Sequence, residues 1–307
     1  MATSPCCPLS SAFLETIFSK ILEKRELHHL DREFMLDKIS LYCEKNQKAC
    51  RKFVETPLKN VKKSNFAADL VRFVRKEAHV RYGMYLTKTI VKAPQIVHDI
   101  EKLAKQSAVH VVNKEKLSSL HHQLLLLHLS TQERLHLYPQ LYRDLFAITG
   151  RPRTIFDLGC GFNGISLFYS HLTDLTYMGC EFNQKDVDLL NQYFRAIKKI
   201  STIDGKAVKI DLIKHPEAVA QHSADVVFAF KIFDLFPSAV VETILKNLQC
   251  TWIIASFSVK NLNKRLMYAP RRAGFQKMMR RLGYTYKTLT YDAELFYIFE
   301  QHNHSTT

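Results

Sequence analysis

The sequence lacks the features of a membrane protein or a secreted protein. No stretch approaches the roughly eighteen consecutive apolar residues that a transmembrane helix needs. The first residues, MATSPCCPLSS, have no cationic segment followed by an extended apolar one, which is the pattern of a secretory signal. We therefore expect a cytoplasmic protein that does not associate with membranes.

The arrangement of the cysteines does not indicate a metal site. The chain has seven cysteines, an odd number, and no two of them form a C-x-x-C pair with the spacing of zinc ligands. This pattern favours free thiols in a reducing compartment. We expect no bound metal.

Lys and Arg residues outnumber Asp and Glu in the chain as a whole, and one long segment has no acidic residue. The formal net charge is +15, and positions 257 to 287 contain nine Lys and Arg residues without any Asp or Glu. A basic block of this kind fits a phosphate backbone, although many charge runs are only solvated faces. The members that we expect to contact RNA are Lys260, Lys264, Arg265, Arg271, Arg272, Arg280 and Arg281.

A second basic patch is predicted near the N-terminus. Residues 1 to 110 contain 20 Lys and Arg against 12 Asp and Glu, and VRFVRKEAHVR brings Arg72, Arg75 and Lys76 together on a helix. A basic helix can also bind an acidic membrane, but this one lacks a broad Trp, Phe or Leu face for insertion. Contacts to the phosphate backbone that do not read the base sequence are typical of proteins that bind folded RNA, because folded RNA is recognised largely by shape.

The periodicity of apolar residues divides the chain in two. From about residue 10 to 127 they recur at three- and four-residue spacing, which predicts helices. After RPRT, short apolar runs alternate with amphipathic segments, as in parallel βαβ units, and the last two runs form a hairpin around YDAE. We predict a helical domain over 1–127 and, over 128–307, a Rossmann-like α/β sheet with an antiparallel C-terminal hairpin.

Glycine is rare, yet three of the nine glycines fall within six positions. Gly159, Gly161 and Gly164 follow the first predicted strand in TIFDLGCGFNGISLFY. Open α/β sheets bind ligands at this point, and glycine allows a tight turn and a close approach of the backbone. The spacing also fits the dinucleotide fingerprint G-x-G-x-x-G, so NAD, S-adenosylmethionine and a turn without a ligand all remain open.

Acidic residues at the strand ends favour S-adenosylmethionine. Asp157 can orient the cationic amino group of a methionine moiety, whereas it would repel a pyrophosphate. Glu181 ends the second strand, where either cofactor would place its ribose hydroxyls. Asp211 follows the third strand and can either contact adenine or stay solvated. Together with Gly159 and Gly161, these three carboxylates are the predicted cofactor residues.

The fourth strand lacks the motifs of two common nucleic-acid methylations. Its end, FAFKIFDLF, has neither the N/D-P-P-F/Y motif of exocyclic amine methylation nor a cysteine for attack on cytosine. Guanine N7 has a free lone pair and no proton, so its methylation needs positioning and stacking without a general base. Phe233 is the candidate for stacking and Lys231 for holding a carbonyl oxygen or a phosphate; the alternative is a core Phe233 and a surface Lys231.

Several motifs resemble those of the aminoglycoside-resistance 16S rRNA (guanine-N7) methyltransferases, the Arm/Fmr family, over about residues 65 to 300. HLSTQERL is the most diagnostic of them, and RFVRKEAHVRYGMYL, VVFAFKIFDLF and AELFYIFEQ add to the likeness. The resemblance implies a class I methyltransferase fold, S-adenosylmethionine as cofactor and a helical N-terminal extension that docks on ribosomal RNA. It also implies that Arg134 holds the cofactor carboxylate and that Lys231 lies beside the target base.

The chain departs from the family pattern at three places. GCGFNG stands where the family often has A-C-G-x-N-P, Glu181 where aspartate is usual, and SFSVKNLNKR where a proline and a glycine-rich stretch are typical. The resemblance implies methylation of guanine N7 in the decoding region of 16S rRNA, within the small ribosomal subunit, and resistance to aminoglycosides. We expect a monomer. The alternatives are another nucleotide, such as an adenine ring nitrogen, and an RNA-binding protein that has lost turnover.

Overall fold

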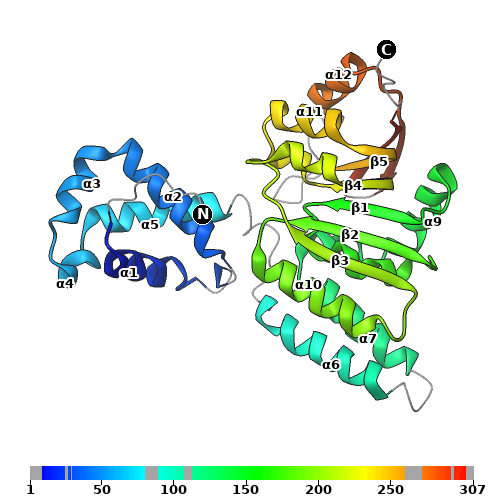
Figure 1. Ribbon diagram of the computed structural model, residues 1–307, viewed down its shortest axis with the longest axis horizontal. Coiled ribbons are helices and arrows are strands. Elements are labelled where there is room, and N and C mark those ends of the chain that lie inside the picture. The colour runs from blue at the N-terminus through cyan, green and yellow to red at the C-terminus, as the bar shows by residue number, and fades with distance from the viewer. Residues whose placement is uncertain are drawn as a thin grey trace. The chain divides into compact units, whose positions relative to one another are not determined.

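A computed structural model describes residues 9–24, 27–28, 30–79, 89–106, 113–259, 272–291 and 294–301 of the chain. The chain forms two compact units, Met1–Ile90 and Val91–Thr307, which are treated separately below (Figure 1). The first unit is helical. The second contains a single large sheet together with the helices that cover it.

The helical unit has five α-helices within its described residues. They are α1 (Ser11–Ile21), α2 (Arg32–Lys45), α3 (Gln47–Val54), α4 (Leu58–Val61) and α5 (Asn65–Ala78). Each helix turns its apolar residues inward, so that Ile17, Ile39 and Val74 are completely buried. The start of α2 is capped by the Asp31 carboxylate, which accepts a hydrogen bond of 2.9 Å from the Glu33 amide.

The second unit is built on a seven-stranded sheet with the order β3-β2-β1-β4-β5-β7-β6. Its strands are β1 (Thr154–Leu158), β2 (Leu175–Glu181), β3 (Ile203–Lys209), β4 (Ser223–Phe230), β5 (Gln249–Ser258), β6 (Lys287–Tyr291) and β7 (Glu294–Glu300). β1 to β5 are parallel, and β7 is antiparallel to both β5 and β6. The predicted Rossmann-like sheet with an antiparallel C-terminal hairpin is confirmed.

Helices cover the sheet. They are α6 (Ala93–Gln106), α7 (Lys114–Leu125), α8 (Leu129–Arg134), α9 (Tyr138–Thr149), α10 (Gln184–Ile197), α11 (Ser238–Asn247) and α12 (Ala273–Arg281). Short 3-10 helices are η3 (Ile90–Lys92), η4 (Asn163–Tyr169), η5 (Pro216–Gln221) and η6 (Phe233–Leu235). The segment after the glycine turn forms the 3-10 helix η4.

Two features of the sheet bring distant residues to one edge. The strand order reverses between β1 and β4, which is where open α/β sheets bind their ligands. In addition, the antiparallel register pairs Glu294, the first residue of β7, with Ser258, the last residue of β5. Glu294 therefore lies at the same edge as the carboxyl ends of the parallel strands.

The boundary between the units lies at residues 90 and 91, whereas the sequence predicted it at 127 and 128. α6 packs against α7 and α10, and α7 packs against η4, so these helices belong to the sheet-bearing unit (Figure 1). His121 of α7 lies 2.9 Å from the Tyr193 hydroxyl of α10. Periodicity identifies a helix but does not say which core it covers, and this accounts for the difference.

Neither a membrane segment nor a metal cluster occurs in the part of the chain that the structure describes. No described helix has the length and apolar character needed to cross a bilayer. The same residues contain no group of three or more His, Cys, Asp and Glu side chains arranged to hold a metal ion.

Candidate active site

The turn after β1 requires glycine at two positions. Gly159 has a φ of +57° and Gly161 a φ of +46°, both in the left-handed region that favours glycine. Space is also restricted, because a Cβ at Gly159 would lie 2.5 Å from Ile232 Cδ1 and one at Gly161 would lie 2.9 Å from His128 Nε2. The turn is therefore fixed by conformation and by packing against Ile232 and His128.

Asp157 stands at the end of β1, directly before this turn, and is 1% exposed. Its Oδ2 accepts hydrogen bonds from the Asn163 side-chain amide at 2.8 Å and the Tyr177 hydroxyl at 2.9 Å. Its Oδ1 has no hydrogen-bond partner. Burial raises the pKa of Asp157 to about 7, so the carboxylate readily accepts a cation or a proton.

Arg134, at the end of α8, is the cationic counterpart of Asp157 and is 2% exposed. Its Nε donates to the two carboxylate oxygens of Glu294 at 2.9 and 3.1 Å, and its Nη1 lies 3.4 Å from Asn163 Oδ1. Its Nη2 has no partner. The pKa of Arg134 lies above its ordinary value, because the Glu294 carboxylate more than offsets the lowering caused by burial.

The two unpartnered atoms have complementary charge. The described residues contain three buried side-chain polar atoms without a hydrogen bond, and Asp157 Oδ1 and Arg134 Nη2 are two of them. Leaving such a group unsatisfied costs about 1–3 kcal/mol. The Asn163 amide links both side chains, because it donates to Asp157 and accepts from Arg134. An α-amino acid group, with one ammonium and one carboxylate, would satisfy both orphaned atoms.

Glu181 ends β2 and contacts the glycine turn. Its Oε2 accepts a hydrogen bond from the Gly161 amide at 3.1 Å, and its Oε1 accepts one from the Phe182 amide at 2.8 Å. Burial raises the pKa of the Glu181 carboxyl, while these amide donors lower it. The structure thus brings Glu181 together with Asp157 and Gly161, at a place suited to hydroxyl donors.

Asp211 follows β3 and is half-buried. Its Oδ1 accepts hydrogen bonds from the Ile213 amide at 3.0 Å and the Lys214 amide at 3.4 Å. These bonds stabilise the turn after the strand, which is a structural role that sequence analysis did not separate from adenine binding.

Lys231 follows β4 in a strained conformation, with a φ of +59°. Its backbone amide donates to the Ser256 carbonyl at 3.0 Å and to Ser256 Oγ at 3.1 Å. The ammonium lies 2.5 Å from Glu133 Oε2 and 3.3 Å from Glu294 Oε2, and the residue is only 7% exposed. Lys231 is therefore part of the buried site and not a surface cation.

Glu294 connects the two cations, and sequence reasoning missed it as a site residue. It contacts Arg134, Lys231 and the Ser256 hydroxyl, and it is 2% exposed. Burial raises the pKa of its carboxyl, but Arg134 and Lys231 reverse this effect and hold the pKa below its usual value. The only sequence signal was its place in AELFYIFEQ, because the antiparallel register that brings it here is not visible in the sequence.

Comparison with known proteins agrees with this geometry. A family model described as "Ribosomal RNA methyltransferase (FmrO)" matches residues 42–298. The chain belongs to the FmrO family of ribosomal RNA methyltransferases. The resemblance found in the sequence motifs is thereby confirmed.

Individual relatives of this FmrO-family chain carry similar names. It is 26% identical over 208 residues to the 16S rRNA (guanine(1405)-N(7))-methyltransferase of Proteus mirabilis, covering 64% of this chain and 70% of that protein. It is 23% identical over 236 residues to the protein of the same name from Frankia casuarinae, covering 75% and 79%.

Solved structures support the fold. The 16S rRNA methyltransferase RmtF, in complex with S-adenosyl-L-homocysteine, aligns with a TM-score of 0.62 at 17% identity and covers 96% of this chain and 100% of its own. The 16S rRNA methylase RmtB aligns with a TM-score of 0.60 at 18% identity and covers 94% and 98%.

Phe233, predicted to stack on the target base, packs into the core of the methyltransferase. Its side chain is 5% exposed, and its ring centroid lies 5.9 Å from that of Phe275 in α12. It belongs to the hydrophobic cluster beneath β4 and β5. This burial favours the alternative interpretation of Phe233 as a core residue.

The predicted RNA residues of the methyltransferase are only partly described. Lys260, Lys264, Arg265 and Arg271 lie outside the described residues. Arg272 donates to Asp234 at 2.6 Å and to the Ser258 carbonyl at 3.0 Å, so it ties the start of α12 to the end of β5. Arg280 is exposed, whereas Arg281 is paired with Glu242.

The three residues of the predicted N-terminal basic patch, Arg72, Arg75 and Lys76, have different environments. Arg75 bonds the Lys20 and Ile21 carbonyls at the end of α1, which is an internal structural contact. Arg72 is exposed and paired with Asp69 at 2.8 Å, and Lys76 is exposed. Of this trio, Arg75 is thus held within the unit, and the other two face solvent.

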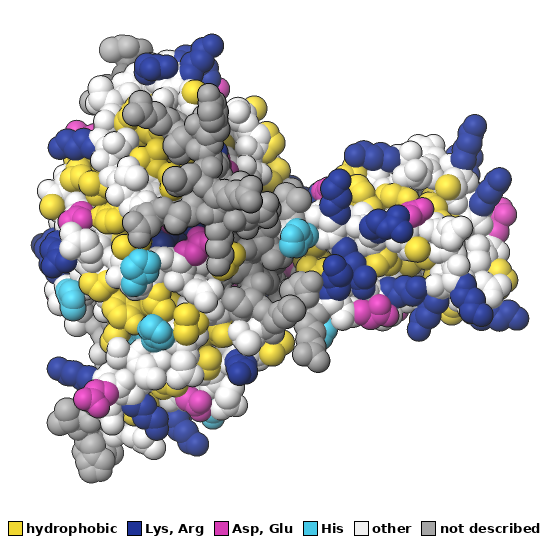
Figure 2. All heavy atoms as spheres, turned by 180° about the vertical axis from the view of Figure 1, so that it is seen from behind, with side chains coloured by type: hydrophobic (Ala, Val, Ile, Leu, Met, Phe, Trp, Pro, Cys, Tyr) yellow, Lys and Arg dark blue, Asp and Glu magenta, His cyan; other side chains and the backbone are white. Residues whose placement is uncertain are grey.

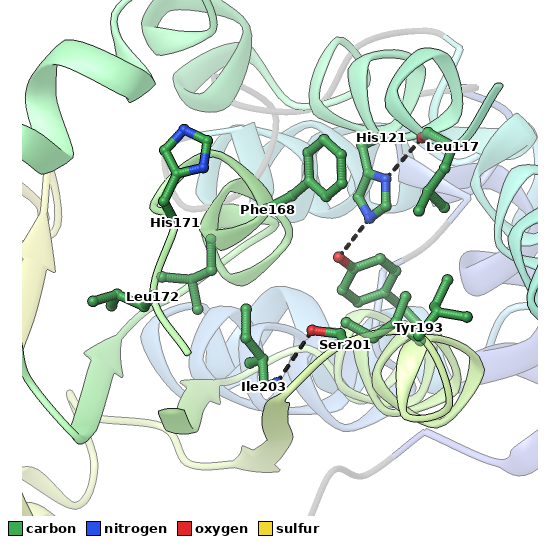
Figure 3. Close-up of a pocket in the computed structure, with 11 residues that line it drawn as sticks. Leu117, His121, Phe168, His171, Leu172, Tyr193, Ser201 and Ile203 are labelled. Atoms are coloured by element: carbon green, nitrogen blue, oxygen red, sulfur yellow. Dashed lines mark hydrogen bonds between the residues drawn. The ribbon is translucent and has the colours of Figure 1, made fainter. Parts of the chain in front are cut away.

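A separate pocket of about 120 Å³ lies at the opposite ends of the strands. It is lined by Leu117 and His121 of α7, Phe168 of η4 and Tyr193 of α10, together with residues that precede β2 and β3 (Figure 3). His121 stacks on Phe168 at 4.1 Å and is held by the Tyr193 hydroxyl, and burial lowers its pKa to about 4. The lining includes neither Asp157, Arg134 and Glu181 nor the glycine turn, so we do not assign the cofactor to this pocket.

Proposed function

We propose that this FmrO-family enzyme transfers a methyl group from S-adenosylmethionine to N7 of a guanine in 16S rRNA. The observation that carries the cofactor assignment is the pair of buried, oppositely charged and unpartnered atoms, Asp157 Oδ1 and Arg134 Nη2. A methionine moiety supplies the ammonium and carboxylate that this pair lacks. NAD has no such group, and Asp157 would repel its pyrophosphate.

Each described residue has a distinct part in binding. Asp157 binds the amino group, Arg134 the carboxylate, and Glu181 the ribose hydroxyls, while Gly159 and Gly161 let the backbone pass close to the ligand. When bound, S-adenosylmethionine supplies an electrophilic methyl group on a positively charged sulfur. Asp211 remains a proposed adenine contact through its turn.

The state of the Glu294 carboxylate supports a ring nitrogen without a proton as the target. Glu294 is paired with both Arg134 and Lys231, which hold its pKa below the usual value. Carboxylates held in ion pairs are poor proton acceptors, because ionised partners lower their affinity for a proton. Guanine N7 needs no general base. Lys231 then serves to hold the guanine carbonyl oxygen or a neighbouring phosphate.

We further propose that the assembled small ribosomal subunit is the substrate, in the cytoplasm, and that the enzyme acts as a monomer. The names of the relatives support 16S rRNA and N7 of guanine. The net charge of +15 supports docking on a large polyanion.

The test is methylation of purified 30S subunits and of naked 16S rRNA with labelled S-adenosylmethionine. Modified guanines are then located by reductive cleavage and reverse transcription. We expect label in the 30S subunits and a single strong stop beside one guanine. Label without chain cleavage would indicate another nucleotide, such as an adenine, and label only in protein would refute an RNA substrate.

A further inference from the structure

The pocket between α7, η4 and α10 shares no lining residue with the methyl-transfer site. Its base is formed by residues that are almost completely buried, among them His121 and Tyr193, each 1% exposed. Its rim is formed by more accessible residues, since Ser201 is half-buried and His171 is exposed. The pocket therefore has a closed floor and an open mouth, which is the form of a small-molecule site.

Three aromatic rings shape this pocket (Figure 3). The His121 imidazole stacks on the Phe168 ring, with centroids 4.1 Å apart and planes inclined by 9°, and meets the Tyr193 ring edge-on at 5.6 Å. Rings of this kind favour stacked and edge-to-face contacts with a further ring. The volume of about 120 Å³ sets the size, because a cavity of about 150 Å³ accommodates benzene. The pocket is thus suited to a single aromatic ring.

The hydrogen bonds of His121 define which atom of the pocket can bind a ligand. Burial lowers the pKa of His121 to about 4, so the ring is neutral at pH 7. Its Nδ1 lies 2.8 Å from the Leu117 carbonyl, which can only accept, so this nitrogen carries the proton. Its Nε2 therefore accepts from the Tyr193 hydroxyl at 2.9 Å. The Tyr193 oxygen, which donates its proton to His121, keeps lone pairs that can accept a hydrogen bond from a ligand.

The charge of the lining indicates an uncharged ligand. Figure 2 shows Lys and Arg side chains distributed over the visible surface of both units. By contrast, the described residues that line the pocket include no Lys, Arg, Asp or Glu. An ion would lose its hydration there without gaining a partner, which costs far more than burying a neutral group. The chemistry therefore selects a neutral aromatic ring with one hydrogen-bond donor, as in a phenol.

The 3-10 helix η4 connects this pocket to the cofactor site. Leu167 and Phe168, near its end, line the pocket, and Asn163, its first residue, bridges the carboxylate and the guanidinium that we assign to the cofactor. Within η4, Ser166 Oγ donates to the Asn163 carbonyl at 2.6 Å. A 3-10 helix of seven residues is intrinsically weak, because its hydrogen-bond geometry is poorer than that of an α-helix. A ring packed against Leu167 and Phe168 would hold η4, and with it Asn163, in this arrangement.

We propose that this pocket is an effector site for a small neutral phenol, whose binding strengthens cofactor binding through η4. The Tyr193 oxygen accepts the hydrogen bond of the phenol hydroxyl, and the ring packs against His121 and Phe168. The coupling rests on the proposed function, because it takes the cofactor as assigned there, whereas binding of the phenol does not depend on it.

The first experiment measures binding of p-fluorophenol to the full-length protein by fluorine NMR. Fluorobenzene tests the contribution of the hydroxyl, and p-fluorobenzoate tests the exclusion of charge. We expect p-fluorophenol to bind about fivefold more tightly than fluorobenzene, as for one neutral hydrogen bond, and p-fluorobenzoate not to bind detectably. Equal binding of the three compounds, or no binding of p-fluorophenol, would overturn the proposal.

Two variants and a control locate the bound probe. Ser201→Leu fills the mouth of the pocket and Tyr193→Phe removes the accepting oxygen, so each should weaken p-fluorophenol binding by about fivefold or more. Tyr284→Phe is the matched control, because Tyr284 is also buried but donates its hydroxyl to the Leu245 carbonyl and does not line the pocket. Thermal unfolding checks that each variant is folded. Unchanged binding in both pocket variants, or an equal loss in Tyr284→Phe, would overturn the proposal.

The second experiment measures S-adenosylhomocysteine binding by calorimetry, with and without saturating p-fluorophenol. We expect the probe to tighten S-adenosylhomocysteine binding about fivefold, and S-adenosylhomocysteine to tighten probe binding by the same factor, because coupling between two sites is reciprocal. An unchanged affinity, or displacement of the probe by S-adenosylhomocysteine, would overturn the effector role. If S-adenosylhomocysteine does not bind at all, the proposed cofactor fails, while the fluorine NMR data still decide whether the pocket is a binding site.

Discussion

A single carboxylate, Glu294, organises the cations of the active site. It accepts from Arg134 Nε on one side and faces Lys231 on the other, and all three residues are buried. This arrangement engages the Nε side of the guanidinium and leaves its Nη2 atom without a hydrogen-bond partner. Glu294 is therefore a positioning residue, which acts on the cofactor through Arg134.

We predict that Glu294→Gln weakens S-adenosylhomocysteine binding by about tenfold or more, because a buried Arg134 that loses its ionised partner is no longer held in place. Calorimetry measures the affinity, and thermal unfolding reports any loss of stability. Glu242→Gln is the control, since Glu242 is also paired with an arginine, but at the surface. Equal affinity in Glu294→Gln and wild type would contradict the positioning role.

Asp157 gives the site a dependence on pH. Burial raises its pKa to about 7, so the carboxyl is protonated and neutral below that pH and ionised above it. A cationic ligand group needs the ionised form. Affinity for S-adenosylhomocysteine should therefore rise as pH increases from about 5 to 7, by up to tenfold per unit, and then level off.

The same shift affects the unliganded protein in the opposite direction. The folded state raises the pKa of Asp157 from an unfolded value near 3.9, so it binds the proton more tightly than the unfolded chain does. The free energy of unfolding should therefore decrease as pH rises from about 4 to 7. Calorimetry over the pH series measures how the affinity for S-adenosylhomocysteine depends on pH. The Asp157→Asn variant should lose this pH dependence, and Glu181→Gln should keep it. A pH dependence of the affinity that persists in Asp157→Asn would assign it to another group.

At the scale of elements, the glycine turn is a connection constrained both by backbone conformation and by packing. Gly161→Ala would require an L-residue at a φ of +46° and a Cβ 2.9 Å from His128. We predict destabilisation by about 1–2 kcal/mol for the backbone conformation alone, and weaker cofactor binding. Urea unfolding and calorimetry measure the two effects.

Gly274→Ala is the matched control for that substitution. Gly274 lies in α12, its φ is not positive, and a Cβ there would meet no atom within 4 Å. Alanine should be neutral or slightly stabilising at this position. Equal destabilisation by the two substitutions would show that the turn is not specially constrained.

Arg75 links two helices of the N-terminal unit, because it donates to the carbonyls that end α1. We predict that Arg75→Ala destabilises this unit by about 1–2 kcal/mol, the loss of a charged hydrogen bond to backbone. Lys76→Ala, one position along α5 and exposed, should have no effect. Hydrogen exchange of α1 amides distinguishes the variants, and equal exchange would contradict the link.

The parts of the fold that depend on local pattern were predictable from the sequence. The strands of the sheet are short apolar runs, and Asp157 and Glu181 end two neighbouring ones, so their meeting at one edge follows from parallel topology. Glu294 was not predictable as a partner of Arg134, because 160 positions and an antiparallel register separate them. The packing of Phe233 against Phe275 was not predictable for a related reason, since the sequence does not tell which side of the chain α12 covers.

At the scale of the whole molecule, some cations are buried at the cofactor site and others are exposed on the surface. The cations of the cofactor site, Arg134 and Lys231, are 2% and 7% exposed, whereas cations of α3 such as Lys48, Arg51 and Lys52 are exposed to solvent. Salt screens exposed charges much more than buried ones. The two binding events of the enzyme should therefore respond differently to ionic strength.

We predict that S-adenosylhomocysteine affinity changes less than about twofold between 50 and 300 mM KCl, while affinity for 30S subunits falls by orders of magnitude. Calorimetry and filter binding at the two concentrations check this. A parallel loss of both affinities would mean that the cofactor site opens to solvent.

The bridging amide of Asn163 has a consequence for stereochemistry. Its NH₂ group donates to Asp157 and its oxygen accepts from Arg134, so the Asp157 carboxylate and the Arg134 guanidinium occupy defined sides of one planar amide. If the side chain and the Cα hydrogen of a bound amino acid keep their positions, inversion of Cα exchanges its ammonium and carboxylate, and each would then meet a like charge. The site is thus handed, and its charges favour one enantiomer of the amino acid moiety in that orientation.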